Sequence, residues 1–299
     1  MASRRFTLAL LSFAGAASLS ASTLADGVLF PGTRPLGTGG ALRALATGDS
    51  GPQLNPSGIS LIRTYQVEGA YQYGKTAASQ DARFSAIDST SGLNLGGALN
   101  YTYHRASLNG QSETGHIIGG SLSFPFADKI FVGGTTKWVH ADDITNHSGF
   151  TYDAGLTVRP MSQLSFGVAG YNLRKFDVAW LPRGVGGGVA VLAMPTLLLV
   201  FDSVYENAST SASSDGTIPA TSSTAVHYMG GAELSFSSAG AVRVGGGWNG
   251  LTRNGYLSAG LSLLSADVGA LDAGLRQDVS GDKKTTILGI SARLFVPSM

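Results

Sequence analysis

The sequence predicts an all-β protein, a transmembrane antiparallel β-barrel of about fourteen strands. Three observations predict it: apolar and polar side chains alternate along segments of about ten residues, short turns alternate with longer loops, and charges within strands keep to one parity. Charged residues make up 13% of the 299 residues, and 42 residues are glycine. Because a soluble domain has about 25% charge and about 7% glycine, the composition argues against an ordinary cytosolic enzyme.

Composition also argues against other classes of protein. Apolar residues make up 43% of the chain, which is enough to bury a core and argues against intrinsic disorder. The chain has 20 basic and 19 acidic residues, so no basic excess is available for a phosphate backbone, and no nucleic-acid partner is expected. It has no cysteine, which removes disulfides, zinc-thiolate sites and cysteine catalysis together.

Residues 1–25 have the three parts of an export signal. Two arginines come first, the apolar residues 6–17 follow, and small residues end at Ala25. We expect this signal peptide to be cleaved after Ala25. An uncleaved anchor is the alternative, but the apolar stretch is short for a membrane span of about 20 residues.

Alternation with a period of two dominates from residue 62 onward. In 64–73, Tyr65, Val67 and Tyr71 lie on one face and Glu68 lies on the other, which is typical of a half-buried strand. The same pattern predicts strands at 64–73, 82–88, 93–104, 116–125, 129–139, 150–159, 164–173, 184–193, 196–205, 225–236, 241–249, 255–264, 268–277 and 285–296. The segments 82–88 and 268–277 alternate most weakly, so a barrel of twelve strands is the alternative.

Connections between these strands alternate in length. Short turns such as 125–128 and 160–163 alternate with longer connections such as 105–115 and 206–224. An even number of strands with short periplasmic turns and longer outer loops is typical of a bacterial outer-membrane barrel. The sheet has to close, because lipid cannot pair the backbone of an open edge. A periplasmic β-sandwich is the soluble alternative, and it predicts scattered aromatic residues with charges mostly in loops.

Charged and aromatic residues of the predicted strands favour the barrel. Charges avoid the apolar parity, since a Lys or Arg facing lipid at mid-bilayer costs about 2 to 4 kcal/mol. The expected luminal charge network is Glu68, Lys137, Asp153, Asp202, Glu233, Arg243, Asp272, Arg276 and Arg293. The expected aromatic girdle near the longer-loop ends is Tyr71, Tyr73, Tyr101, Tyr103, Trp138, Tyr152, Tyr205, Tyr228, Trp248 and Tyr256. Asp153 and Glu233 are interpreted as partners of Lys137 and Arg243.

Residues 26–61 lack alternation and are rich in glycine. Within them, 41–46 can form one or two helical turns, and Asn55-Pro56-Ser57-Gly58 is a turn signal. Two interpretations of this tetrapeptide stay open. It is either a hinge before the first strand, with Pro56 fixing φ and Gly58 free to take a positive φ, or an ordinary turn.

The glycine-rich segment resembles a known family. Leu36-Gly37-x-Gly39-Gly40-Ala41, then Asp49, then Asn55 to Gly58, is similar to the N-terminal motif of the FadL-type outer-membrane transporter superfamily (OmpP1/FadL/TodX). The stretches 151–156 and 164–173, followed by Leu181-Pro182, are similar to its PorV/PorQ-like branch. The resemblance implies a barrel of fourteen strands over 62–299 and an N-terminal luminal plug, or hatch, over 26–61. The plug and hinge candidates are then Gly37, Gly39, Gly40, Asp49, Asn55, Pro56 and Gly58.

Other motifs resemble chemical sites only in spacing. Residues 69–76 match the phosphate-binding pattern Gly-x4-Gly-Lys-Thr, but they continue a strand, and no helix follows. Glycines at 184–188 likewise run into a strand, where they are expected to clear the lumen for the plug. The set His140, Asp142, Asp143 and His147 could hold a divalent cation. All five histidines, however, are better interpreted as polar residues of the rim, and we expect no catalytic residue, metal or cofactor.

Two functions remain open at this point. The resemblance implies passive uptake of a small hydrophobic or amphipathic compound, and Leu198, Val200 and Met229 would give the lumen an apolar side. The alternative is a PorV-like outer-membrane scaffold that docks secretion or surface-assembly proteins and transports nothing, which the luminal charge network favours. In both cases the lipid bilayer of the bacterial outer membrane is the expected partner, and the protein is not expected to be an enzyme.

Overall fold

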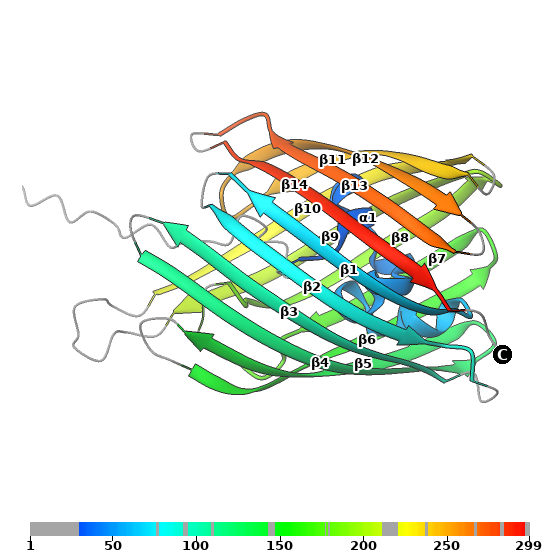
Figure 1. Cartoon of the computed structure of the whole chain (residues 1–299), viewed down its shortest axis with the longest axis horizontal. Coiled ribbons are helices and arrows are strands. Elements are labelled where there is room, and N and C mark those ends of the chain that lie inside the picture. Colours follow the sequence, from blue (N-terminus) through cyan, green and yellow to red (C-terminus); the bar gives the residue numbers. More distant parts are fainter. Residues whose placement is uncertain are drawn as a thin grey trace, which may run out of the picture.

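Fourteen antiparallel strands close into a barrel (Figure 1). The computed structural model describes residues 30–296 apart from 76–77, 92–94, 109–110, 143–146, 177, 179, 211–220, 237–238, 266–267 and 282–283. The expected signal peptide lies outside the described residues. Each strand pairs with its neighbours in sequence, and β1 pairs with β14 to close the sheet.

Strand bounds follow the predicted segments in order. They are β1 (Tyr65–Gly74), β2 (Ser79–Asp88), β3 (Gly96–Leu108), β4 (Gln111–Ala127), β5 (Ile130–Asp142), β6 (His147–Met161), β7 (Leu164–Tyr171), β8 (Arg183–Met194), β9 (Leu197–Thr210), β10 (Thr221–Phe236), β11 (Gly240–Asn249), β12 (Asn254–Ser265), β13 (Gly269–Asp278) and β14 (Thr286–Phe295). The twelve-stranded alternative is therefore wrong, because both weakly alternating segments, in β2 and β13, pair along their whole length.

Several connections are shorter than the alternation suggested. The predicted loop 105–115 is largely strand, since β3 continues to Leu108 and β4 begins at Gln111. In the same way, β9 continues to Thr210, and β10 begins at Thr221. Apolar alternation marks only the part of a strand that touches the apolar band, whereas backbone pairing continues into polar sequence beyond it.

Large apolar side chains cover the outer face of the barrel. In β13, exposed and buried residues alternate from Ala270 onward, with Leu271 60% exposed and Asp272 buried beside it. The outer positions of other strands follow the same rule, for example Leu99, Ile118 and Ile290, each more than half exposed. An apolar surface of this extent is unfavourable in water and matches a lipid-facing band.

The predicted aromatic girdle is found with one exception. Tyr71, Tyr152 and Trp248 are exposed on the outer face near the ends of their strands that lie toward the longer connections. Tyr256 was wrongly placed: it is buried in the lumen, and its hydroxyl donates a hydrogen bond to the carbonyl of Gly39 at 2.7 Å. Successive side chains of a strand point to opposite faces, and because its neighbour Leu257 points outward, Tyr256 points into the lumen.

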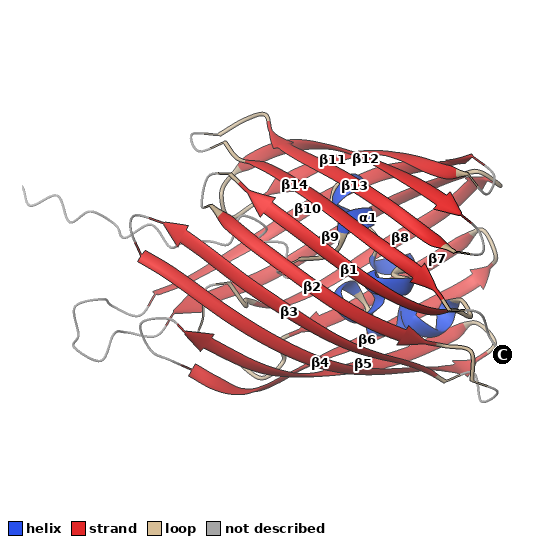
Figure 2. Ribbon diagram, in the orientation of Figure 1, coloured by secondary structure: helices blue, strands red, loops and turns tan. Residues whose placement is uncertain are grey.

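Residues 30–61 lie inside the barrel and form the luminal segment (Figure 2). It consists of short helical turns, α1 (Thr33–Gly37), η1 (Arg43–Leu45), η2 (Gly48–Ser50), α2 (Gly51–Leu54) and η3 (Pro56–Leu61). They pack mainly on β4 to β8 and β11 to β14. The stretch 41–46 forms a single 3-10 turn. None of the helices formed by the described residues has the length and apolar character of a membrane span.

The connection between β7 and β8 also folds into the lumen, from the opposite end. Its residues Val178, Trp180 and Leu181 are buried against Ile117 and Val139 of the wall. A Cβ atom added at Gly115 would collide with the Trp180 ring, so that glycine makes room for the indole. The barrel interior is therefore filled by two irregular segments rather than by wall side chains alone.

Replacing Ile290 by Arg should destabilise the barrel in lipid by about 2 to 4 kcal/mol, because this outward position of β14 would carry a charge into hydrocarbon. Urea titration in phospholipid vesicles, read by the shifted mobility of the unboiled barrel on a gel, measures the change. Ile290→Val is the matched control. Equal midpoints for Ile290→Arg and Ile290→Val would show that this face does not meet lipid.

Candidate functional site

Charged side chains form a ladder of ion pairs that joins the luminal segment to the wall. It begins in α1, where Arg34 forms two hydrogen bonds with Glu233 of β10, at 2.8 and 2.9 Å. Glu233 also accepts a hydrogen bond from Arg243 at 2.6 Å, and these two residues lie directly opposite each other on β10 and β11. This pairing was suggested by the sequence, whereas Arg34 was not in the expected network.

The ladder continues around the wall to β1. Arg243 is 3.1 Å from Asp272 of β13, and Asp272 is 3.2 Å from Arg293 of β14. Arg293 then pairs with Glu68 at 2.9 Å, across the junction that closes the barrel. With Arg34 and Glu233, the ladder has three basic side chains alternating with three acidic ones.

Arg34 keeps its charge within the ladder because it lies beside a carboxylate. Burial by itself lowers the pKa of Arg34, but the neighbouring Glu233 carboxylate outweighs it, and the pKa is raised from its ordinary value. Arg34 is therefore charged at every physiological pH. Removing one member of such a buried pair leaves the other charge unpaired, which costs more than the pair itself contributes.

A second, fully buried ion pair anchors the middle of the luminal segment. Arg43 in η1 lies 3.1 Å from Asp202 of β9, and neither side chain is exposed. Asp202 also accepts hydrogen bonds from the backbone N–H groups of Leu42 and Arg43, both at 2.9 Å. The Arg43 guanidinium donates a further bond to the Tyr171 hydroxyl at 2.8 Å. Sequence reasoning found Asp202 by its parity but missed Arg43, because the segment that carries it has no periodicity.

The candidate glycines of the motif allow close backbone contact with the wall. Gly39 and Gly40 have positive φ, at 74° and 89°. A Cβ on Gly39 would lie 2.7 Å from backbone atoms of Gly246, and one on Gly37 would lie 3.0 Å from the Cα of Gly260. Glycines on both sides of the contact therefore let the segment lie directly on β11 and β12.

Asp49 is held on the opposite side of the lumen. It forms an ion pair with Arg83 of β2 and accepts a hydrogen bond from the Ser85 hydroxyl at 2.7 Å. Arg83 also donates to the carbonyl of Phe30, at the first described residue. The structure thus places the motif aspartate in a buried contact that ties two parts of the luminal segment to one strand.

The tetrapeptide 55–58 is hydrogen-bonded both to the luminal segment and to the wall. Asn55 donates hydrogen bonds to the carbonyl of Arg43 at 2.9 Å and to Thr157 of β6 at 3.1 Å. Ser57 and Thr157 hydroxyl oxygens are 2.7 Å apart, and Pro56 begins η3. Gly58 does not take the positive φ that the hinge interpretation would allow it. It is needed because a Cβ there would collide with the Ala46 carbonyl.

The remaining members of the expected network pair nearer the other end of the lumen. Lys137 is 2.8 Å from Asp153, as the sequence suggested, and its ammonium also donates to Asn172 at 2.6 Å. Arg276 lies 3.7 Å from Asp278 and stacks on the ring of Tyr256. Eight of the nine expected charges are buried inside the barrel, and the ninth, Arg293, is half-buried.

Two histidines were wrongly assigned to the rim. His104 and His227 are buried in the lumen, where they lie 2.7 Å from Asp81 and 3.0 Å from Glu206. Both occupy inward positions of β3 and β10, which strand parity could have revealed. His116 is half-buried.

The suggested cation set is not assembled by the described residues. Asp143 lies outside them, as does the side chain of His147. Among the residues that the structure does describe, no group of three potential metal ligands occurs. The phosphate-binding pattern at 69–76 is likewise not a loop, since 65–74 is strand β1.

Apolar lumen residues are covered rather than open. Leu198, Val200 and Met229 pack against Ala41 and Leu42 of the luminal segment. Gly186 in β8 leaves space for Arg43, as expected of the glycines at 184–188, because an added Cβ would lie 2.7 Å from its guanidinium.

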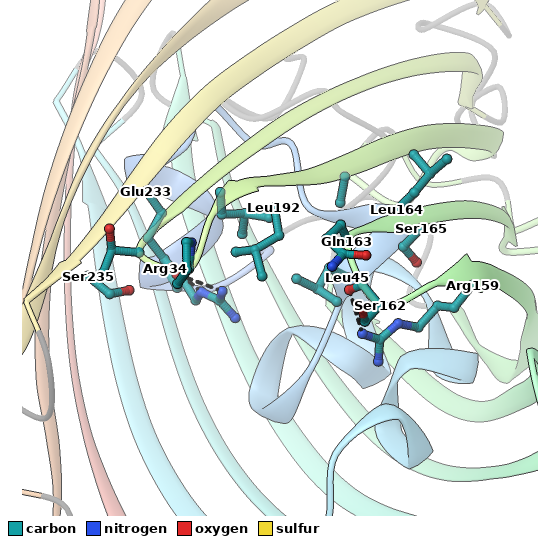
Figure 3. A pocket seen from close by; sticks show the side chains of 14 residues that line it. Arg34, Leu45, Arg159, Ser162, Gln163, Leu164, Ser165, Leu192, Glu233 and Ser235 are labelled. Carbon is teal, nitrogen blue, oxygen red and sulfur yellow. Dashed lines mark hydrogen bonds and ion pairs between the residues drawn. The ribbon is translucent and has the colours of Figure 1, made fainter.

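Two small cavities open at the short-turn end, and Arg34 borders both. One, of about 180 Å³, lies between η1, α1 and β6 to β10 (Figure 3). The other, of about 190 Å³, lies between α1, η2, β1 and β14, where Glu68 and Arg293 line it. Arg34 therefore stands between both hollows, with Glu233 lining only the first, and a shift of the Arg34 side chain would change the shape of each.

Comparisons with known proteins identify the fold. No protein-family model matches the chain, and no curated protein matches it. Among solved structures, the CymD monoaromatic hydrocarbon channel is 11% identical, with a TM-score of 0.70 over 89% of this chain and 98% of its own. The toluene transporter TbuX of Ralstonia pickettii is 12% identical, with a TM-score of 0.68 over 89% of this chain and 98% of its own.

A FadL homologue of Pseudomonas aeruginosa is also similar. It is 10% identical, with a TM-score of 0.67 over 88% of this chain and 98% of its own. At such identities the likeness shows the fold alone, so the FadL-type barrel implied by the sequence resemblance is confirmed. The more specific likeness to the PorV/PorQ branch stays a prediction.

Replacing Arg43 by Met should lower the free energy of unfolding by about 3 to 5 kcal/mol, because Asp202 would stay buried without its cation. Urea titration in vesicles measures the loss. Arg253→Met, at an exposed turn, is the control and should change stability by less than about 0.5 kcal/mol. Adding Asp202→Leu to Arg43→Met should recover most of the loss, and the interpretation fails if the single and double variants are equally unstable.

Proposed function

We propose that this protein is an outer-membrane channel for the passive uptake of a small hydrophobic or amphipathic compound. In this proposal residues 1–25 are removed on export, residues 26–61 form a plug, and residues 62–299 form the barrel. The observation that carries it is a FadL-type barrel whose lumen holds a segment bound through ion pairs and glycine contacts. No catalytic role is assigned to the luminal carboxylates described above, since each of them forms an ion pair with a basic side chain.

The pattern of contacts supports a plug that can move. The luminal segment is held to the wall by ion pairs and hydrogen bonds, including those of Arg34, Arg43 and Asp49, and by apolar packing of residues such as Leu42 and Leu54. Buried ion pairs contribute little net stability compared with apolar packing of the same volume. Although the luminal charges were expected to favour a scaffold, ion pairs and hydrogen bonds can exchange partners when a ligand enters, so they are compatible with a plug that moves.

The neighbours support the ligand class. CymD is described as a monoaromatic hydrocarbon channel and TbuX as a toluene transporter. By analogy in fold, we propose that this chain takes compounds of similar size and low polarity. Such a ligand would enter from the longer-loop end, displace the plug locally and leave through the barrel, with no coupled energy source.

Cells that carry the protein in their outer membrane should take up radiolabelled toluene several-fold faster than cells without it, because the channel bypasses the polar outer leaflet. Initial uptake rates in intact cells measure the effect, and a small sugar of equal size serves as the test of selectivity. A rate equal to that of empty cells would favour the non-transporting scaffold instead.

A reversible cross-link gives a matched control within the same protein. The hydroxyl oxygens of Ser60 in η3 and Ser123 in β4 are 2.7 Å apart, a separation suited to a disulfide after replacement of both by Cys. The chain has no other cysteine. Oxidised Ser60→Cys/Ser123→Cys should take up toluene more slowly than its reduced form, and equal rates would contradict movement of the plug.

Weakening the ion-pair ladder should loosen the plug. Glu233→Gln leaves Arg34 and Arg243 without their shared carboxylate, so we expect a several-fold increase in leak of small polar solutes from vesicles. Asp128→Asn is the control, because it makes the same chemical change at an exposed turn. If the two variants leak equally, the ladder does not hold the plug in place.

A further inference from the structure

The cavity beside Arg34 has the size and lining of a small-molecule site. Its volume is about 180 Å³, and an apolar cavity of about 150 Å³ in another protein is large enough to hold benzene. Leu45 of the luminal segment forms one wall, and Leu192 and Leu198 of the barrel form another. A body of one six-membered ring therefore fits between the luminal segment and the wall.

Part of this apolar lining is open to solvent. Leu192 is 37% exposed, and Leu45 is only half-buried. Both side chains face the hollow rather than the lipid, as the close view shows (Figure 3). Exposed apolar surface within a hollow is unfavourable unless something covers it, so the lining favours a ligand with an apolar body.

The polar edge of the cavity is cationic. Arg34 and Arg159 both line it, and Figure 3 shows Leu45 and Leu192 between them. Glu233 is the one carboxylate among the lining residues, and it is already shared by Arg34 and Arg243. The lining residues therefore carry a net charge of +1, which favours an anionic group on the ligand.

Arg159 is suited to receive that group. Its guanidinium donates to the carbonyl of Ser162 at 3.2 Å, which uses one of its five N–H donors. A guanidinium binds a carboxylate through two parallel hydrogen bonds, a geometry that a lone carbonyl or hydroxyl does not match.

We propose that this hollow is a binding site for a compact carboxylic acid, with a single-ring body on Leu45, Leu192 and Leu198 and its carboxylate on Arg159. The site goes beyond the proposed function, because a ligand can bind here whether or not the barrel conducts it. It lies at the short-turn end of the lumen, where a compound leaving the barrel would pass.

Fluorine NMR of 4-fluorobenzoate with the purified full-length protein in detergent tests the site. Binding is read from line broadening, and 4-fluorotoluene and 4-fluorobenzylamine provide neutral and cationic probes of the same size. We expect 4-fluorobenzoate to bind at least about tenfold more tightly than either, since hydrogen bonds to charged groups are the stronger ones. Equal broadening of all three probes would overturn the proposal.

Two variants locate the binding. Ser235→Trp places an indole in the cavity and should abolish binding, whereas Phe236→Trp, on the outer face of the same strand, should leave it unchanged. Arg159→Gln should weaken binding about tenfold or more, with Arg253→Gln at the opposite end as its control. Unchanged affinity in both Ser235→Trp and Arg159→Gln would place the acid elsewhere. Gel mobility of unboiled samples shows which variants are folded, so Arg159→Gln decides alone if Ser235→Trp does not fold.

Discussion

Every backbone N–H and C=O group that faces hydrocarbon has to be paired within the protein, and the rest of this structure depends on that constraint. Fourteen strands meet it by closing on themselves, so that β1 and β14 pair along nine residue positions. Closure assigns every second side chain to the outside and the others to an enclosed space. The outward set is apolar, and the inward set carries the charges.

Enclosure then creates a second requirement, because a lumen lined with charges needs partners for them. The luminal segment supplies some: Arg34 for Glu233, Arg43 for Asp202 and Asp49 for Arg83. Other charges are matched strand to strand, as Arg293 is with Glu68. Wall and segment therefore carry opposite charges where they meet, and glycines at the points of contact let their backbones approach closely.

The same complementarity relates the structure to its proposed role. Polar contacts and the apolar packing of residues such as Leu42 and Leu54 together hold the segment in place. The two cavities that Arg34 lines lie between the segment and the wall. A channel of this kind would open by exchanging a few ion pairs and hydrogen bonds, which is a smaller rearrangement than unfolding the segment.

Much of the barrel could be predicted from the sequence because strand periodicity is local. Alternation placed all fourteen strands in order and put charges such as Asp272 and Arg293 on the inner face. It also gave the partners of Glu233 and Asp153 within the wall. The predictions for Tyr256 and His227 were wrong because they were based on residue type. The alternation of their strands would have placed both side chains in the lumen.

The sequence by itself determined which strands form and which of their side chains face lipid, since a period of two follows from the geometry of an extended chain. Only the tertiary structure decided how the lumen is filled. Arg43 meets Asp202 across 159 residues, and Gly58 is required by the Ala46 carbonyl rather than by its own φ. The physical reason is that the luminal segment has no regular period, so its contacts are set by the shape and charge of a wall that exists only once the barrel has closed.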